Sequence, residues 1–478
     1  MNKPLNRQLY EQLRQAILLG EWTAGARLPT SRQLAEQYDM ARMTVQQALD
    51  QLQAEGYIVT RPGAGVFVTD DLLLPDALHT AESAAPRFSH WGGRLQASRP
   101  VRSQSGRTST LRNQPHIDID FGFGRSFATI FPYDIWRKML SRYLGTDDAI
   151  LTRYGSIGGF EPLREAIATY VSRWRQIDCT AEQVVIVNGI QQAIDIVNRL
   201  FINRGDEVLV EEPGYVNAYR VFQVYGAKLR PLPVDDDGFP VESIPADSRA
   251  KLVFVTPANQ FPRGGSMPLA RRLRLLAWAK NNNAYIVEDD YDGELRYDGH
   301  PLASLRSLDQ HGRVIYLGSF SKVLFPALRV GYVVLPPELL RPFLQTKQLM
   351  DRGAPTLTQA AVADFIANGH FERHVRKLRK AYGPRHAALC DALGRYLDGV
   401  VAYNRTPAGL QMMLRLPAEW DETAVIEKAA SAGVAVYGGT PFHLREPACP
   451  SLMLGFSGLD VVEIDEGIAR LGRVMDGL

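Results

Sequence analysis

The sequence predicts a multidomain chain in which an N-terminal winged helix-turn-helix domain precedes a large α/β domain with a smaller lobe. Three observations support this. The first 70 residues hold short helical patterns that end in a glycine-rich turn. Residues from about 71 to 115 are rich in Ser, Pro, Gly and Ala and lack apolar periodicity. From Ile117 onward, apolar strands alternate with helical patterns. We therefore expect a domain over 1–70, a basic linker over 71–116 and a large domain over 117–478.

The composition is that of an ordinary globular protein. The chain has 478 residues, of which 45% are hydrophobic and 22% are charged. No apolar run approaches the roughly 20 residues of a membrane span, and the polar N-terminal pattern gives no signal-peptide core. Cys179, Cys390 and Cys449 lack the paired spacing of a metal site or a disulfide framework. We therefore predict a cytoplasmic protein with reduced thiols and no metal. The net charge of +2 does not indicate a partner.

Three helices are predicted in the first domain. The first carries apolar residues at four-residue spacing, and Thr30 with Ser31 offers a cap for the second. A turn of three or four residues around Asp39 and Met40 leads to the third helix. The residues expected to face inward from the three helices are Leu9, Leu13 and Ile17, then Leu34, Ala35 and Tyr38, then Val45, Ala48, Leu49 and Leu52.

The second and third helices have the spacing of a helix-turn-helix, whose second helix presents its N-terminal residues to the DNA major groove. The segment from Gly56 to Val68 follows, with two short strands joined at Pro62 and Gly63, and it predicts a β-wing. The side chains expected to contact DNA bases or phosphates are Arg32, Arg42, Thr44, Gln46, Gln47 and Arg61.

These residues resemble the GntR family of DNA-binding regulators. The segments RLPTSRQLAEQY, ARMTVQQAL and GAGVFV stand close to the usual pattern of that family in order and spacing, and the match covers about 65 residues. The resemblance implies a double-stranded DNA operator as partner. The alternative is a helical module that binds another protein.

The linker is basic. Between residues 87 and 115 it has no acidic residue. Two interpretations are open: the charges are solvated, or the linker lies along DNA phosphates and adds salt-dependent affinity. Its arginines are Arg87, Arg94, Arg99, Arg102, Arg107 and Arg112.

In the large domain, several motifs at strand ends suit a phosphorylated pyridine aldehyde. Gly189 stands where the strand 184–187 passes into a helix, and a helix N-terminus favours a phosphate. Asp289 ends another strand, where a carboxylate can keep a pyridine nitrogen protonated. Lys322 ends a third strand in Gly-Ser-Phe-Ser-Lys, with Arg329 seven residues later. A lone lysine is usually a surface residue, so the prediction depends on the combination of motifs.

These motifs, in this order, resemble fold-type I aminotransferases, which use pyridoxal 5′-phosphate (PLP), over residues 117 to 478. The resemblance implies that Lys322 forms the internal aldimine and that Asp289 pairs with the pyridine nitrogen. Tyr291 and Asn259 would approach the ring hydroxyl, and Tyr215 would stack on the ring. The residues implied for the phosphate cup are Gly189, Ile190, Ser319, Ser321 and Arg329.

Two further points follow from this resemblance. Tyr154 is similar to the tyrosine that reaches the phosphate of a neighbouring subunit, which implies a homodimer. Met453 stands where aminotransferases commonly have an arginine that binds the substrate α-carboxylate, and methionine cannot form that ion pair. Either another arginine substitutes, with Arg445 and Arg220 as candidates, or the ligand lacks a conventional α-carboxylate. Efficient transamination is therefore in doubt.

A GntR-like domain joined to an aminotransferase-like domain resembles the MocR/GabR type of transcription regulator. The resemblance implies that an amino compound, or PLP itself, alters the dimer and its operator binding. Two alternatives remain: a working aminotransferase with an attached DNA-binding domain, and a DNA-binding protein whose PLP fold is a vestigial scaffold. The intact lysine, aspartate and phosphate cup disfavour the scaffold. The sequence does not identify the effector, the operator or the sign of regulation.

Overall fold

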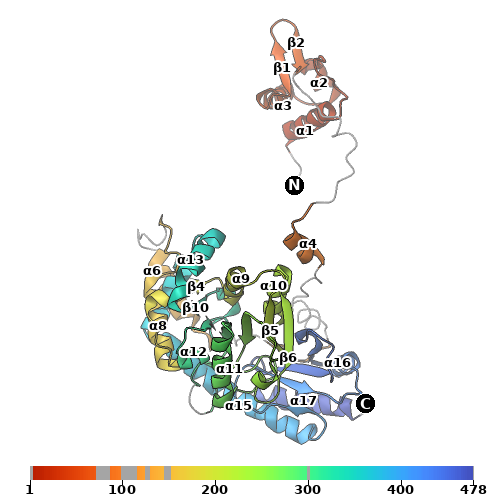
Figure 1. The fold of residues 1–478 in the computed structure, drawn as a ribbon. Helices are drawn as coiled ribbons and strands as arrows, with labels where there is room; N and C mark the ends of the chain where they lie inside the picture. Colours follow the sequence, from red (N-terminus) through yellow and green to blue (C-terminus); the bar gives the residue numbers. More distant parts are fainter. Residues whose placement is uncertain are drawn as a thin grey trace. The chain divides into compact units, whose positions relative to one another are not determined.

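The structure is a computed structural model that describes residues 4–70, 87–97, 116–123, 130–144, 152–298 and 302–476. The chain divides into two compact units, Met1–Ser89 and His90–Leu478 (Figure 1). Among the described residues, no helix has the length and apolar character needed to cross a membrane.

The first unit contains the predicted three helices and wing. Helices α1 (Leu5–Leu18), α2 (Ser31–Gln37) and α3 (Arg42–Ala54) precede strands β1 (Ile58–Arg61) and β2 (Gly65–Val68). The strands pair antiparallel. The apolar residues predicted to face inward from α1 and α3 are buried, as is Leu34 of α2, while Ala35 and Tyr38 pack against this core from partly buried positions.

The start of α2 shows why the helix begins there. Thr30 accepts a hydrogen bond from the backbone N–H of Gln33 at 3.3 Å, and the Gln33 side chain accepts one from the Thr30 N–H at 2.9 Å. This reciprocal cap satisfies two N–H groups that a helix start would leave unpaired. The predicted cap at Thr30 is confirmed.

The second unit is built on a seven-stranded sheet in the order β4-β10-β9-β8-β7-β5-β6. Strand β10 runs antiparallel to its neighbours β4 and β9, and the remaining pairs are parallel. The strands β4 to β9 therefore end at one edge of the sheet. Their bounds are β4 (Val184–Val187), β5 (Glu207–Glu212), β6 (Lys228–Pro233), β7 (Leu252–Val255), β8 (Tyr285–Asp290), β9 (Val314–Ser319) and β10 (Gly331–Val334).

Helices cover both faces of this sheet, because its strands are apolar on both sides. One face packs against α9 (Ile190–Phe201), α10 (Val216–Tyr225) and α13 (Pro337–Asp351). The other face packs against α8 (Glu161–Arg175), α11 (Leu269–Asn281), α12 (Leu305–Leu308) and α14 (Thr356–Ala367). Helix α6 (Tyr133–Leu144) packs on α14.

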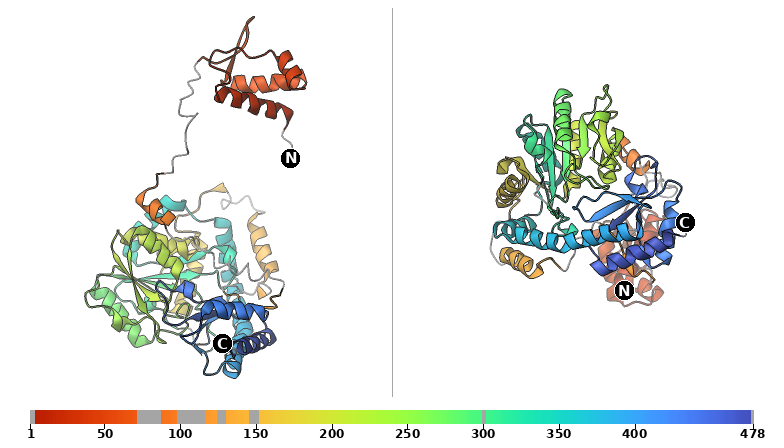
Figure 2. Two further views of the ribbon diagram at one scale, coloured as in Figure 1. Left: turned by 90° about the vertical axis from the view of Figure 1, so that its right-hand side faces the viewer. Right: turned by 90° about the horizontal axis from the view of Figure 1, so that it is seen from below.

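The smaller lobe is C-terminal. Its four-stranded sheet has the order β11-β12-β15-β14. The long helix α15 and the last helix α17 lie side by side in this lobe (Figure 2). The bounds are α15 (His370–Tyr396), β11 (Ala402–Tyr403), β12 (Gln411–Arg415), α16 (Glu422–Ser431), β13 (Val434–Ala435), β14 (Tyr437–Gly438), β15 (Ser451–Gly455) and α17 (Val461–Met475). Strand β3 (Ile119–Asp120) pairs with β13, so the segment entering the large domain joins this lobe.

Part of the expected irregular linker is helical. Helix α4 (His90–Ala97) lies within it and packs against α10 of the large lobe. The Nε of Arg94 donates a hydrogen bond to the Val224 carbonyl at 2.6 Å. The Trp91 ring meets the Tyr225 ring edge-on, at 6.2 Å between centroids. Sequence periodicity missed this helix because two glycines interrupt its eight residues.

Candidate functional site

The predicted cofactor residues follow strands of the large sheet. Asp289 is the next-to-last residue of β8, Ser319 is the last residue of β9, and Lys322 comes three residues later. Gly189 precedes α9 and Tyr215 precedes α10, which follow β4 and β5. Ligands bind at this edge of open α/β sheets because loops from several strands converge there.

Asp289 is a buried carboxylate at this edge. Its side chain is 3% exposed, and its Oδ1 has no hydrogen-bond partner among the described residues. Burial raises the pKa of Asp289 well above its usual value, and the negative charges of Asp290 and Asp292 raise it further. A buried carboxylate oxygen without a partner is unfavourable. A protonated ring nitrogen of PLP would supply the missing donor, so this residue fits the cofactor.

Lys322 lies close enough to two carboxylates to interact with them. Burial lowers the pKa of the Lys322 amine, while Asp292 and Asp289 oppose that shift. Two hydroxyl side chains precede it, and the backbone N–H of Ser321 donates to the Ser319 Oγ at 3.2 Å. A lowered pKa enlarges the fraction of neutral amine, which is the form that attacks an aldehyde carbon.

The turn after β4 forms a cradle for an anion. Gly189 has a φ of +75°, and a Cβ there would stand 2.6 Å from the Nη2 of Arg329. That Nη2 donates to the Asn188 carbonyl at 3.2 Å. Ile190 is the first residue of α9, whose N-terminus adds a positive dipole end. Glycine, guanidinium and helix start therefore suit the PLP phosphate, and a side chain at position 189 would fill their space.

Tyr215 lies among aromatic rings. Its ring is 5.9 Å from that of Phe261, nearly perpendicular to it, and 6.5 Å from that of Phe254. Burial raises the pKa of the Tyr215 hydroxyl, and the charge of Asp289 raises it further. The hydroxyl therefore stays protonated, and the ring has the apolar surroundings expected of a stacking residue.

Asn259 contacts Tyr291, which was predicted to approach the ring hydroxyl, and Asp292, which the sequence analysis missed. Its Nδ2 donates to the Tyr291 hydroxyl oxygen at 3.1 Å and to the Asp292 Oδ2 at 2.8 Å. Asp292 is 2% exposed, and burial raises its pKa to about 8. A third aspartate, three residues after Asp289, was the available signal, but the polar run from Glu288 to Asp292 did not show which of its side chains would face the site.

The sequence analysis also missed a buried ion-pair network next to Asp289 in the sequence. The Nε of Arg175, at the end of α8, lies 2.7 Å from the Oδ2 of Asp290. The Tyr316 hydroxyl donates to the same oxygen at 2.6 Å, and Glu294 lies 3.9 Å from Arg175. These contacts hold Asp290, the residue that follows Asp289 at the end of β8.

The position at which aminotransferases commonly have the carboxylate-binding arginine is apolar in this chain. Met453 of β15 is fully buried in a cluster with Phe261, Tyr291, Met413 and Phe442. This cluster contains the tyrosine predicted to meet the ring hydroxyl, so the wall beside the cofactor residues is formed by sulfur and aromatic groups.

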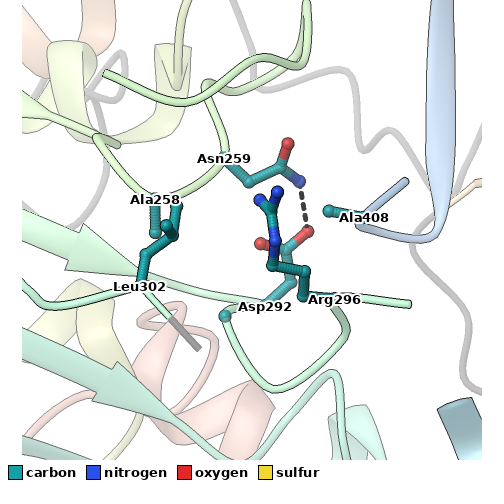
Figure 3. A pocket seen from close by; sticks show the side chains of 7 residues that line it. Ala258, Asn259, Asp292, Arg296, Leu302 and Ala408 are labelled. Atoms are coloured by element: carbon teal, nitrogen blue, oxygen red, sulfur yellow. Dashed lines mark hydrogen bonds between the residues drawn. The ribbon is translucent and has the colours of Figure 1, made fainter. Parts of the chain in front are cut away.

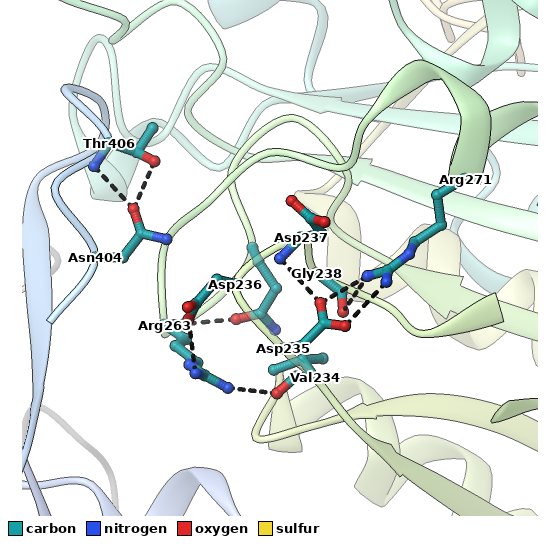
Figure 4. Close-up of polar contacts among 10 residues, drawn as sticks. Val234, Asp235, Asp236, Asp237, Gly238, Arg263, Arg271, Asn404 and Thr406 are labelled. Carbon is teal, nitrogen blue, oxygen red and sulfur yellow. Dashed lines mark hydrogen bonds and ion pairs between the residues drawn. The ribbon is translucent and has the colours of Figure 1, made fainter. Parts of the chain in front are cut away.

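Nearby arginines have other partners or lie at the surface. Arg263 pairs with Asp236 at 2.8 Å and donates to the Val234 carbonyl (Figure 4). Arg445 is exposed, although its backbone N–H donates to Glu212 at 3.0 Å. Arg220 is partly buried on α10. None of these contacts identifies a replacement for the arginine.

Tyr154 lies at the surface, unlike the buried Asp289, Tyr291 and Asn259. Its side chain is 87% exposed, and the guanidinium of Arg352 lies over its ring at 5.3 Å. Gly159, in the loop that follows, packs closely on β4, since a Cβ there would stand 2.4 Å from Ile186.

The residues predicted to contact DNA differ in whether their side chains have intramolecular partners. Arg42 is exposed at the first turn of α3 and has no ion pair with any described residue. Thr44 is half-buried in the same turn. The others have intramolecular partners: Gln46 donates to Asp50 at 2.8 Å, Gln47 accepts from Asn6 at 3.2 Å, Arg32 meets Glu36 at 3.4 Å and Arg61 meets Asp70 at 2.6 Å.

Comparison with known proteins assigns each of the two parts of the chain to a family. Residues 5–68 match the model of bacterial regulatory proteins of the gntR family. Residues 132–471 match the model of aminotransferase class I and II. Both matches agree with the fold class predicted from the sequence.

Two curated relatives combine the same parts. The probable rhizopine catabolism regulatory protein MocR of Rhizobium meliloti is 36% identical, over 98% of this chain and 93% of its own length. The pyridoxine biosynthesis transcriptional regulator PdxR of Corynebacterium glutamicum is 32% identical, over 81% of this chain and 78% of its own length.

Solved aminotransferases share the large domain. The kynurenine aminotransferase of Pyrococcus horikoshii, solved in complex with PMP, is 31% identical with a TM-score of 0.75, over 82% of this chain and 97% of that one. LysN of Thermus thermophilus, solved with N-(5′-phosphopyridoxyl)-L-leucine, is 31% identical with a TM-score of 0.72 and the same coverage.

Proposed function

Because the chain belongs to the MocR type of transcription regulators, with a gntR-family domain and an aminotransferase class I and II domain, we propose that the state of its cofactor site controls its affinity for an operator. Its cofactor is PLP, and its DNA-binding domain gives it DNA as a partner. The observation that carries the proposal is the presence, in one chain, of a gntR-family helix-turn-helix domain and a site with groups that suit PLP. Because its gntR-family domain binds DNA, we propose that it acts in the cytoplasm.

The proposed signal is an amino compound or PLP itself. When bound, PLP supplies an aldehyde carbon that reacts with amines and a ring that accepts electrons. In this chain, Lys322 would hold the cofactor covalently, Asp289 would keep the ring nitrogen protonated, and the start of α9 with Arg329 would hold the phosphate. A ligand that binds one conformation better than another shifts the equilibrium between them. We infer that the signal acts on operator binding in this way.

We also propose a homodimer. The exposed Tyr154, which Arg352 covers from one side, would reach the phosphate of the other subunit's cofactor. Two winged helices in one dimer would then contact two half-sites of an operator, as two-fold symmetric regulators do.

Removal of the cofactor tests the regulatory proposal. An operator is first selected from random DNA with the full chain. Its affinity is then measured by fluorescence anisotropy for the PLP-loaded protein and for protein stripped with hydroxylamine. We expect the two dissociation constants to differ by roughly 5- to 150-fold, the usual range of coupling between sites. Reloading with PLP should restore the first value. Equal constants would mean that the cofactor site does not control DNA binding.

The basic linker gives a second test. We predict that replacing Arg99, Arg102 and Arg107 together with glutamine flattens the dependence of operator affinity on salt. Each lost phosphate contact should lower the slope of log affinity against log salt by about 0.9. These three positions lie outside the described residues. Arg94 is excluded from the set because its guanidinium already donates to Val224.

The matched control removes three charges elsewhere. It replaces exposed arginines of the large domain, and its slope should equal that of the wild type. Sequence preference should persist in the linker variant, because phosphate contacts carry little base information. An unchanged slope would mean that the linker is only a tether. The control positions are Arg137, Arg173 and Arg395.

A working aminotransferase is the other candidate function. The cofactor residues favour it, and the solved structures similar to this chain include aminotransferases. The buried Met453 opposes it, because a carboxylate beside the apolar cluster would lack a cation. Steady turnover with an amino acid and a 2-oxo acid would support the enzyme.

A further inference from the structure

One face of the sheet in the C-terminal lobe packs against residues assigned to the cofactor. Side chains alternate between the two faces of a strand. Leu452 and Leu454 of β15 belong to the main core of the domain. Met453, between them, packs in a different cluster with Phe261 and Tyr291 of the large lobe. Met453 is therefore directed from one lobe toward the other, and it is fully buried there.

The neighbours of Met453 on this face are also apolar. Met413 of β12 and Tyr437 of β14 lie opposite Met453 in the sheet. The ring of Phe442 lies 5.4 Å from that of Phe261. We call these five side chains the apolar wall: Phe261, Met413, Tyr437, Phe442 and Met453.

The apolar wall begins at the predicted cofactor residues. The Phe261 ring lies edge-on to the Tyr291 ring at 5.5 Å between centroids and to the Tyr215 ring at 5.9 Å. Tyr291 is the residue predicted to approach the ring hydroxyl of PLP, and Tyr215 the residue predicted to stack on the ring. A ligand held at the cofactor and extending toward the C-terminal lobe would therefore meet aromatic rings and thioethers.

Two carboxylates hold the edges of the apolar wall. The Tyr437 hydroxyl donates to Asp120 at 2.6 Å. The loop after Phe442 is bound by Glu212, which accepts the backbone N–H of Leu444 at 2.9 Å. A ligand carboxylate at the wall would be repelled by these like charges.

Arg296 lines a pocket near the wall in which it already has acidic neighbours. Figure 3 shows its side chain beside the Asn259 amide, which donates to the Asp292 Oδ2 at 2.8 Å. The Arg296 Nη2 lies 3.7 Å from Asp298. Gly409 closes the pocket on one side, since a Cβ there would stand 2.8 Å from the Asn259 Nδ2. A ligand carboxylate would have to compete with these acidic groups for the guanidinium.

We propose that the cofactor site takes as its ligand a primary amine that has an apolar body and no acid group, the class of alkylamines and arylalkylamines. The apolar body would pack on the wall, and Met453 would be a specificity-determining residue. The inference rests on the proposed function, because it names the chemical class of the amino compound that would act there.

The wall discriminates by the free energy of burying a charge. An alkyl or aryl group that packs on thioethers and rings leaves water, which is favourable. A carboxylate in the same place loses its hydration and gains no cation from the wall, which is unfavourable. An amine should therefore bind better than the amino acid with the same side chain.

The test compares ligands that differ only in the carboxylate. The PLP-loaded full chain is titrated with 3-methylbutylamine and L-leucine, then with 2-phenylethylamine and L-phenylalanine, and the absorbance of bound PLP gives each dissociation constant. The same pairs are titrated against free PLP, so that the intrinsic preference of PLP can be divided out. We expect the corrected constants to favour the amines by about 10-fold or more.

L-Leucinamide separates charge from size. It has nearly the shape of L-leucine but no negative charge, so its corrected constant should lie closer to that of the amine. If leucinamide binds as poorly as L-leucine, the site excludes the substituent for its size, and the inference is overturned.

Two variants ask which residue sets the preference. Met453→Arg puts a guanidinium into the wall and should lower the preference for the amines by about 10-fold, the value of one hydrogen bond to a charged group. Arg445→Ala is the control, because this exposed side chain should not contribute. If Met453→Arg does not fold, the ratios of the wild type and of Arg445→Ala decide.

The outcomes are distinct. Equal or tighter binding of the amino acids by the wild type overturns the inference, as does the lack of a spectral response to the amines. A loss of L-leucine affinity in Arg445→Ala also overturns it, since that arginine would then supply a cation. An unchanged preference in folded Met453→Arg overturns the role of Met453. An amine that binds but leaves operator affinity unchanged would instead contradict the proposed function.

Discussion

Replacing Lys322 with alanine should abolish covalent retention of PLP. In the wild type, borohydride should fix the cofactor to this lysine, and a digest should show the added mass on the peptide that contains it. In the variant, fixed cofactor should fall to background, because no other lysine shares the strand-end position beside Ser319 and near Asp289. The cofactor-dependent difference in operator affinity should disappear at the same time.

Lys251→Ala is the matched control. This lysine is 44% exposed and pairs with Asp206 at 2.7 Å, so its loss should leave labelling intact. Cofactor fixed on a peptide other than that of Lys322 would contradict the assignment, whatever the effect on DNA binding.

Replacing Arg42 with alanine should weaken specific operator binding by about 1–3 kcal/mol, which is the value of one good base contact. This corresponds to roughly 5- to 150-fold in the dissociation constant. Arg42 is exposed at the start of α3, and no described residue pairs with it. Arg42 can therefore contact DNA without first breaking an ion pair with another described residue. The absorbance of bound PLP should not change.

Arg14→Ala removes the same charge near the other end of α3, where the Arg14 Nε donates to the Tyr57 hydroxyl at 2.8 Å. Its operator affinity should stay close to that of the wild type. Equal affinities for the Arg42 variant and the wild type would place the reading surface elsewhere on the winged helix.

The sequence predicted the elements whose signals are local. The stripe of Val45, Ala48, Leu49 and Leu52 gave α3 because its spacing is that of one helix face. Gly189 was predicted because a strand that runs into a helix through glycine is a local pattern with a clear physical reason.

The rest depends on contacts between distant segments. The Arg175–Asp290 pair joins α8 to β8 across more than a hundred residues, and neither residue alone indicates its partner. The bond between Asn259 and Asp292 depends on how two loops meet, and Gly409 from a third segment makes it possible. Helix α4 forms because α10 offers Val224 and Tyr225, which no pattern within 71–116 reveals.

The docking of α4 on α10 limits the reach of the DNA-binding domain. His90 follows Asp70, the last described residue of the winged-helix domain, by only 20 residues. A fully extended chain gains at most about 3.6 Å per residue, so the winged helix stays within about 70 Å of this anchor. If α4 were not docked, the linker would extend from residue 70 to residue 116, and the winged helix could reach more than twice as far from the large domain. DNA sites beyond the shorter radius are therefore excluded by geometry, whatever their base sequence.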